Sequence, residues 1–204
     1  MLSNSTDDDA HDKLVQEKLV SFCKLLDSNY RQIKQLIGPE RANVDKTLVK
    51  ASRYELLEKS GISTTSKVYT EDQIEKILTE CLNEINERLI ATGRLVSTLD
   101  DDYEKLLQSY RELDEASRTL NWSRTDSPLI SGTSTQKGLE YYLQEGYLAV
   151  QQLNLVVIQV KFTFNAVDML DKASIERFRD CLKMSEELDA YLQEFVAYTV
   201  FIVK

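Results

Sequence analysis

The fold is decided by one stretch of the chain, residues 78–120, which reads LTECLNEINERLIATGRLVSTLDDDYEKLLQSYRELDEASRTL. Apolar residues recur in it at alternating steps of four and three, and only Thr92 and Ser117 interrupt them. A 3.5-residue period sustained beyond four heptads is typical of helices that pack along their length, as in a coiled coil. The apolar positions of this seam, which we predict to form a protein interface, are Leu78, Leu82, Ile85, Leu89, Val96, Leu99, Tyr103, Leu106, Tyr110, Leu113 and Leu120.

The start of this helix is marked by Thr70 and Gln73, which have the spacing of a capping box. In that motif the hydroxyl accepts from the third helical amide and the glutamine side chain accepts from the capping residue. We therefore predict one long coiled-coil helix over residues 70–120. Gly93 lies inside it and is the expected place for a bend or a local weakness.

The rest of the chain divides at its few helix breakers, since it holds only 6 glycines and 2 prolines. Gly38 and Pro39 should end a first helix, and the Ser-, Thr- and Gly-containing stretch after Asn121 marks the clearest internal boundary. The predicted parts are a disordered acidic tail (1–12), an N-terminal helical hairpin (13–60), a loop (61–69), the long helix (70–120), a linker (121–137) and a C-terminal helical hairpin (138–204).

Residues 155–167 fit two descriptions. Apolar residues continue a heptad register through them, which favours a helix, but they also alternate with polar ones from Ile158 to Ala166 and are partly β-branched, which favours a strand. We favour the helix, because a lone strand would need a partner that this chain barely offers. As a helix the segment would be apolar nearly all round, as expected of one in the middle of a bundle.

These patterns predict an all-α fold in which long heptad-patterned helices form an elongated coiled coil or helical bundle. The predicted helices after the linker are shorter than the 70–120 helix, so that part of its seam should remain for another chain to cover. The apolar C-terminal end is a second predicted docking surface, because exposed apolar patches favour association. Its interface residues are Phe195, Phe201 and Ile202.

The residues that enzymes use are scarce. The one histidine, His11, falls in the predicted tail, which removes catalytic systems that need a positioned imidazole and sites rich in histidine. No glycine-rich phosphate loop occurs. The cysteines, Cys23, Cys81 and Cys181, lack metal or redox spacing and are expected to be buried. We therefore predict no catalytic, cofactor-binding or metal-binding residues, no small-molecule substrate, and no enzyme activity.

A formal net charge of −9 excludes partners that need a basic surface. Nucleic acids and anionic membranes both draw on lysine and arginine, so we expect neither nucleic-acid binding nor membrane insertion. The odd cysteine count and the lack of a signal-like segment predict a cytoplasmic or nuclear protein. Ser5, Thr6 and Ser127 are candidate phosphorylation sites, the first two beside aspartates and the third before a proline.

Two functions fit this sequence. The first is a non-enzymatic structural or scaffolding subunit of an intracellular multiprotein complex, which contacts other helical subunits in a hetero-oligomer rather than a homo-oligomer. The second is a self-contained helical bundle that acts as an adaptor or regulator and holds a partner helix or peptide in an apolar groove. In the first, the chain would need its partner to cover the long seam. In the second, it would cover the seam itself.

Overall fold

The computed structural model describes the backbone of residues 4–65, 69–124 and 126–203, and the side chains of these residues except 4–8, 60–65, 201 and 203. Every regular element in this part of the chain is a helix, which confirms the predicted all-α class and the helical assignment of residues 155–165. The elements are α1 (Asn4–Gln35), the π-helical turn η1 (Leu36–Glu40), α2 (Arg41–Thr65), α3 (Glu71–Ser117), α4 (Pro128–Ser131), α5 (Leu139–Asn165), α6 (Lys172–Cys181) and α7 (Glu186–Val203).

The helices form bundles in two compact units that are interleaved along the chain. Unit 1 comprises residues 1–33, 99–157 and 184–204, and unit 2 comprises residues 34–98 and 158–183. The linker at 121–137, which the sequence suggested as the internal boundary, therefore lies within unit 1. Three of the four divisions fall inside α1, α3 and α5, where no loop residues mark them, and the fourth falls in the loop between α6 and α7.

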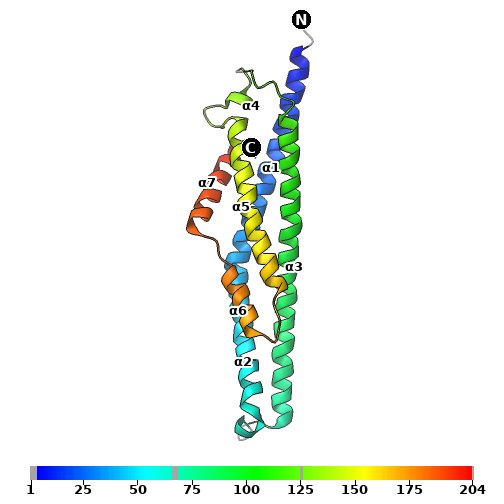
Figure 1. The fold of residues 1–204 in the computed structure, drawn as a ribbon, viewed down its shortest axis with the longest axis vertical. Coiled ribbons are helices and arrows are strands. Elements are labelled where there is room, and N and C mark those ends of the chain that lie inside the picture. Colours follow the sequence, from blue (N-terminus) through cyan, green and yellow to red (C-terminus); the bar gives the residue numbers. More distant parts are fainter. Residues whose placement is uncertain (1–3, 66–68, 125, 204) are drawn as a thin grey trace. The chain divides into compact units, whose positions relative to one another are not determined.

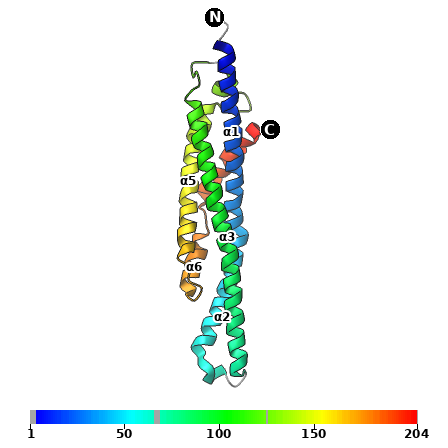
Figure 2. The same cartoon turned by 90° about the vertical axis from the view of Figure 1, so that its right-hand side faces the viewer.

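Unit 1 is built on α1, α3 and α5, which lie side by side in it (Figures 1 and 2). Its core is apolar and draws on all of these helices and on α7, with Phe22, Leu106, Tyr142 and Phe195 among its fully or almost fully buried side chains. Aromatic rings are frequent in it. Tyr142 contacts Phe195 of α7 at 6.4 Å between ring centroids, which fastens the last helix to α5.

Unit 2 contains η1, α2, α6 and the adjoining parts of α3 and α5, with α6 packed against α2 (Figure 1). Its core includes Val44, Ile85, Val160, Ile175 and Phe178. Gly93 of α3 does not mark a break. A Cβ atom there would lie 3.0 Å from two ring atoms of Phe164, so the glycine leaves room for that ring.

The capping box at the start of α3 is confirmed. The amide of Thr70 donates to Oε1 of Gln73 at 2.9 Å, and the amide of Gln73 donates to Oγ1 of Thr70 at 3.4 Å. Helix α3 ends at Ser117, and residues 118–120 form turns. The end is closed by Trp122, whose Nε1 donates to the carbonyl oxygen of Ser117 at 3.1 Å.

The structure corrects the prediction of an N-terminal hairpin. Helical backbone runs from Asn4 through η1 to Thr65, so Gly38 and Pro39 do not end a helix. Proline lacks an amide hydrogen and its ring clashes with the carbonyl four residues back, and a widened π-turn accommodates both. Residues 4–12 are helical as well, and aspartates near a helix N-terminus are favourable there. Of the predicted loop, residues 61–65 are helical and residues 66–68 lie outside the described part.

The predicted C-terminal hairpin over residues 138–204 is corrected as well, because the described part of this range holds three helices, α5, α6 and α7, and not two. α6 ends at Cys181, and Ser185 begins α7 by accepting a hydrogen bond at its Oγ from the amide of Leu188 at 3.2 Å. The signal was present in the sequence, because a serine followed by Glu186 and Glu187 is typical of a helix start. Ser185 also fits the heptad register of its neighbours, which favours one continuous helix in a prediction from periodicity.

Candidate protein-binding surfaces

The seam of the long helix faces the inside of the chain's own fold. Nine of the thirteen seam positions are buried and the other four are half-buried. The buried ones are Ile85, Thr92, Val96, Leu99, Tyr103, Leu106, Leu113, Ser117 and Leu120, and the half-buried ones are Leu78, Leu82, Leu89 and Tyr110. The chain's own helices therefore cover most of the seam, and the predicted cover by another chain stays a prediction for its half-buried positions.

Two tyrosines of the seam show how the cover is made within unit 1. The Tyr110 hydroxyl donates to the carbonyl oxygen of Leu143 at 2.9 Å, and the Tyr103 hydroxyl to that of Val150 at 3.5 Å. Both acceptors belong to α5. A buried hydroxyl needs such a partner, so these bonds fix α5 against α3.

The C-terminal docking surface is largely internal as well. Phe195 and Ile202 are buried in unit 1, while the Phe201 side chain lies outside the described residues. Tyr30 of α1 donates to Oδ1 of Asp189 at 2.6 Å, and this bond holds the beginning of α7. The chain therefore provides much of the cover that its apolar end requires.

One of the three candidate phosphorylation sites, Ser127, has its side chain in the described part of the chain and is not on the surface. Its hydroxyl donates to Oδ2 of Asp12 at 2.7 Å, beside ion pairs of Arg124 with Asp9 and Asp12. A phosphoryl group there would set negative charge against a carboxylate in a closed space. The side chains of Ser5 and Thr6 lie outside the described residues.

Among the described residues, α5 carries more exposed large apolar side chains than any other helix, although others are exposed too, such as Val49 and Leu56 of α2. On α5 this surface comprises Tyr147, Leu148 and Leu155 in unit 1 and Ile158 and Phe162 in unit 2. Leu155 is 63% exposed and Phe162 is 76% exposed, and they belong to a group of exposed apolar residues on one helix, which is more informative than a single exposed leucine. The sequence placed this helix in the middle of a bundle because it is apolar nearly all round. The structure covers only part of its circumference.

A groove in unit 1 adjoins this surface, between α5 and the first turns of α7. It has a volume of about 390 Å³ and is lined by Leu148, Gln152, Ser185, Glu187, Leu188 and Tyr191. The Tyr191 hydroxyl donates to both the carbonyl oxygen and Oε2 of Glu145, each at 3.0 Å. Burial first, and then this carboxylate, raise the pKa of Tyr191, so that the hydroxyl stays protonated as a fixed donor.

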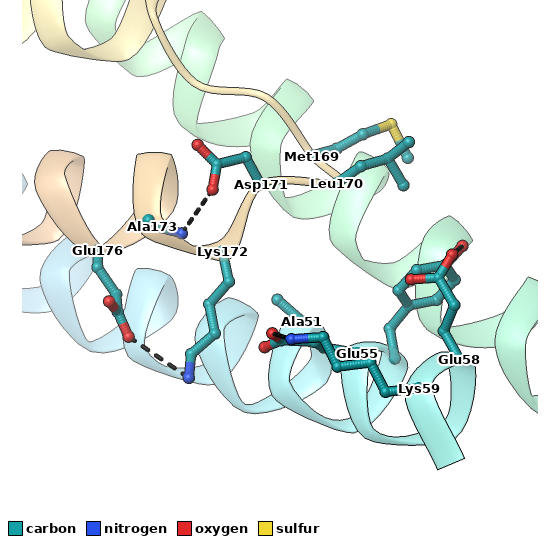
Figure 3. Close-up of a pocket in the computed structure, with 11 residues that line it drawn as sticks. Ala51, Glu55, Glu58, Lys59, Met169, Leu170, Asp171, Lys172, Ala173 and Glu176 are labelled. Carbon is teal, nitrogen blue, oxygen red and sulfur yellow. Dashed lines mark hydrogen bonds and ion pairs between the residues drawn. The ribbon is translucent and has the colours of Figure 1, made fainter. Parts of the chain in front are cut away.

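A second pocket, of about 400 Å³, lies in unit 2 between α2 and the start of α6 (Figure 3). It is lined by Ala51, Tyr54, Glu55, Glu58, Lys59, Met169, Leu170, Asp171, Lys172, Ala173 and Glu176. Its two lysines are paired within the pocket, Lys59 with Glu55 and Lys172 with Glu176 at 3.5 Å. Asp171 caps α6 by accepting from the amide of Ala173 at 3.0 Å. Exposed pairs of this kind bind one another weakly and offer no group poised for chemistry.

The cysteines are all free thiols and all buried. Burial raises the pKa of Cys23 to about 12 and also raises that of Cys181, which disfavours the thiolate that a nucleophile or a metal ligand requires. Among the residues that the structure describes, no three histidine, cysteine or carboxylate side chains gather as metal ligands would.

No helix in the described ranges is long and apolar enough to cross a membrane. Comparisons of the chain with models of protein families, with curated proteins and with solved structures gave no match.

Proposed function

We propose that this chain is a non-enzymatic helical protein that binds other protein chains, and that it does so as a self-contained bundle acting as an adaptor or regulator. One observation carries the proposal, which is the row of large apolar side chains that α5 leaves exposed. Soluble proteins seldom leave such surfaces open on one element unless they dock something there. Covering Leu155 and Phe162 would remove well over half of each side chain from water.

The bundle form is favoured over a subunit that needs help to fold, because the chain's own helices cover most of the α3 seam. The role of structural subunit in a larger assembly is a second candidate. It is supported by exposed apolar residues on a second helix, Val49 and Leu56 of α2 in unit 2, which would give the chain more than one contact. In both cases the proposed partners are proteins.

The net charge of −9 supports a partner other than a second copy, since two such chains repel one another. It also supports a role without nucleic acid. We place the protein in the cytoplasm or nucleus, as its odd number of cysteines favours.

The test is site-specific cross-linking in the source cell. A photo-reactive amino acid replaces Leu155 or Phe162, and the exposed Glu80 of α3 serves as the matched control position. We expect the same cross-linked protein in repeated experiments at one or both α5 positions and not at Glu80. Cross-linking at neither α5 position, or an equal yield of the same proteins at all three, would overturn the proposal.

A further inference from the structure

The groove between α5 and α7 in unit 1 has the dimensions and lining of a site for helix side chains. Leu148 and Leu188 supply apolar walls, and the Tyr191 ring is held in place by its bonds to Glu145. Leu155 stands one heptad beyond Leu148 along α5, about 10 Å at 1.5 Å per residue. An amphipathic helix presents apolar side chains at the same interval, seven residues apart.

Within unit 1, the charged side chains of the two helices that form the groove are all negative. There, α5 and α7 carry six carboxylates and neither lysine nor arginine. These carboxylates belong to Glu140, Glu145, Glu186, Glu187, Asp189 and Glu194. Glu187 lines the groove itself and Glu186 is exposed next to it in sequence, whereas Asp189 is engaged by Tyr30. Lys183 is the only basic residue between Cys181 and Val203.

From this combination we infer that the groove accepts an amphipathic helix of a different protein, one that carries lysine or arginine beside its apolar stripe. The inference rests on the proposed function and names the chemistry of the partner. The apolar stripe would cover Leu148 and Leu155, and the basic side chains would meet Glu186 and Glu187. Complementary charge of this kind selects partners by penalising those of the wrong sign.

The same charges argue against two other occupants. A second copy of this chain would bring the same carboxylates to the groove and a net charge of −9 with it. An anionic membrane surface would be repelled by the acidic rim. A basic helix is the occupant for which both the apolar wall and the rim are favourable.

The test uses the full chain and two synthetic helical peptides of about 20 residues with an identical leucine stripe. One peptide carries lysines beside the stripe and the other carries glutamates. Fluorescence anisotropy at physiological salt measures both affinities. We expect the lysine peptide to bind about tenfold more tightly, which is the effect of two or three exposed ion pairs.

Variants test whether Glu186 and Glu187 cause the preference for the lysine peptide. Reversing both glutamates (Glu186→Lys with Glu187→Lys) should abolish or invert the preference between the peptides. The matched control (Glu75→Lys with Glu80→Lys) makes the same charge change at exposed positions of α3 in unit 2 and should leave the preference intact. Leu148→Gln should weaken the binding of both peptides.

Equal affinity for the two peptides would overturn the basic partner, and binding of neither would overturn the groove as a helix site. A concentration-dependent dimer that Leu148→Gln abolishes would instead identify a second copy as the occupant and overturn the inference. The cross-linking experiment tests Leu155 and Phe162 in the cell, and its result does not depend on whether the peptides bind. If a partner is cross-linked at these positions but neither peptide binds, this inference is contradicted and the proposed function is still supported.

Discussion

At the scale of single residues, the glycines of the long helices decide how closely the helices approach. A Cβ atom on Gly146 of α5 would lie 3.0 Å from two ring atoms of Phe22 and 3.4 Å from a ring atom of Tyr110. The two rings also meet each other edge to face, with their centroids 5.5 Å apart. The missing side chain thus makes room for two aromatic residues from other helices of unit 1.

Substituting Gly146→Ala should therefore destabilise the protein by about 1–3 kcal/mol, because the added methyl group forces packed rings apart. Alanine's better helix propensity, worth about 1 kcal/mol, should not offset this cost fully. Urea denaturation followed by circular dichroism measures the change. Gly38→Ala is the control, since a Cβ there would meet nothing within 4 Å, and that variant should be unchanged or slightly more stable. Equal effects of the two substitutions would contradict the packing argument.

Tyr110 ties stability to pH in the alkaline range. Burial, followed by the charges of Asp114 and Tyr147, raises the pKa of its hydroxyl from 10.0 to about 12. Above pH 10 the unfolded chain releases this proton while the folded chain still holds it, so the free energy of unfolding falls as the pH rises toward 12. Below pH 10 the contribution is fully present.

Tyr110→Phe should make that alkaline fall less steep. At pH 8 the variant should be less stable than the wild type by about 1 kcal/mol, for the lost hydrogen bond to Leu143. The gap should narrow between pH 10 and 12, because phenylalanine does not titrate. Denaturation midpoints at a series of pH values measure both trends. A gap that stays constant across this range would show that Tyr110 ionises normally in the folded protein.

At the scale of elements, α5 has two apolar faces, of which one is buried and the other is exposed. Leu153 is fully buried, whereas Leu155, two residues away, is 63% exposed. A helix advances 100° per residue, so positions two apart point to nearly opposite sides. Both side chains are leucine. One is buried and the other is exposed because neighbouring helices cover only one side of α5.

The two leucines should respond differently to the same substitution. Leu153→Gln buries an amide in the core of unit 1 and should destabilise the protein by about 3 kcal/mol or more. Leu155→Gln should change stability by less than about 0.5 kcal/mol and should reduce binding of the proposed partner. Thermal melts and cross-linking yields measure the two effects. A large loss of stability on Leu155→Gln would mean that this face is already covered within the chain.

At the scale of the whole molecule, the chain's own helices cover most of the longest apolar seam, part of which was predicted to remain for a partner. α1 and α5 both contribute to this cover in unit 1. Asn29 of α1 donates to the carbonyl oxygen of Asp102 on α3 at 3.1 Å, and Lys18 pairs with Glu112 at 2.6 Å. We therefore expect the chain to fold without a second chain.

The purified chain should accordingly be a monomer with a mass near 23.5 kDa and should melt cooperatively. Light scattering over a range of concentrations measures the mass, and calorimetry measures the cooperativity. The net charge of −9 should oppose association through the open face of α5 at low salt. A chain that aggregates, or that melts without a transition until another protein is added, would favour the structural subunit instead of the self-contained bundle.

Local patterns along the chain were enough to predict the all-α class and the long helices. Heptad spacing and the scarcity of glycine and proline predicted the long helices, and local chemistry placed the capping box at Thr70 and Gln73 correctly. Helical period and capping depend on residues within a few positions of each other, so they can be read along the chain. Ser185, followed by two glutamates, is also a local signal for a helix start. The same serine fits the heptad spacing of its neighbours, which favours a continuous helix.

Which apolar surfaces are covered could be learned only from the way the helices pack. The periodicity of the α3 seam and the apolar circumference of α5 are equally visible in the sequence, but the first is mostly internal and part of the second is open. Cover depends on which helices from distant parts of the chain come to lie alongside, as α5 does against Tyr110, and the apolar pattern of one helix does not specify its neighbour. The groove near Leu148 and Leu188 could not be foreseen for the same reason, because its two walls are formed by helices separated by α6.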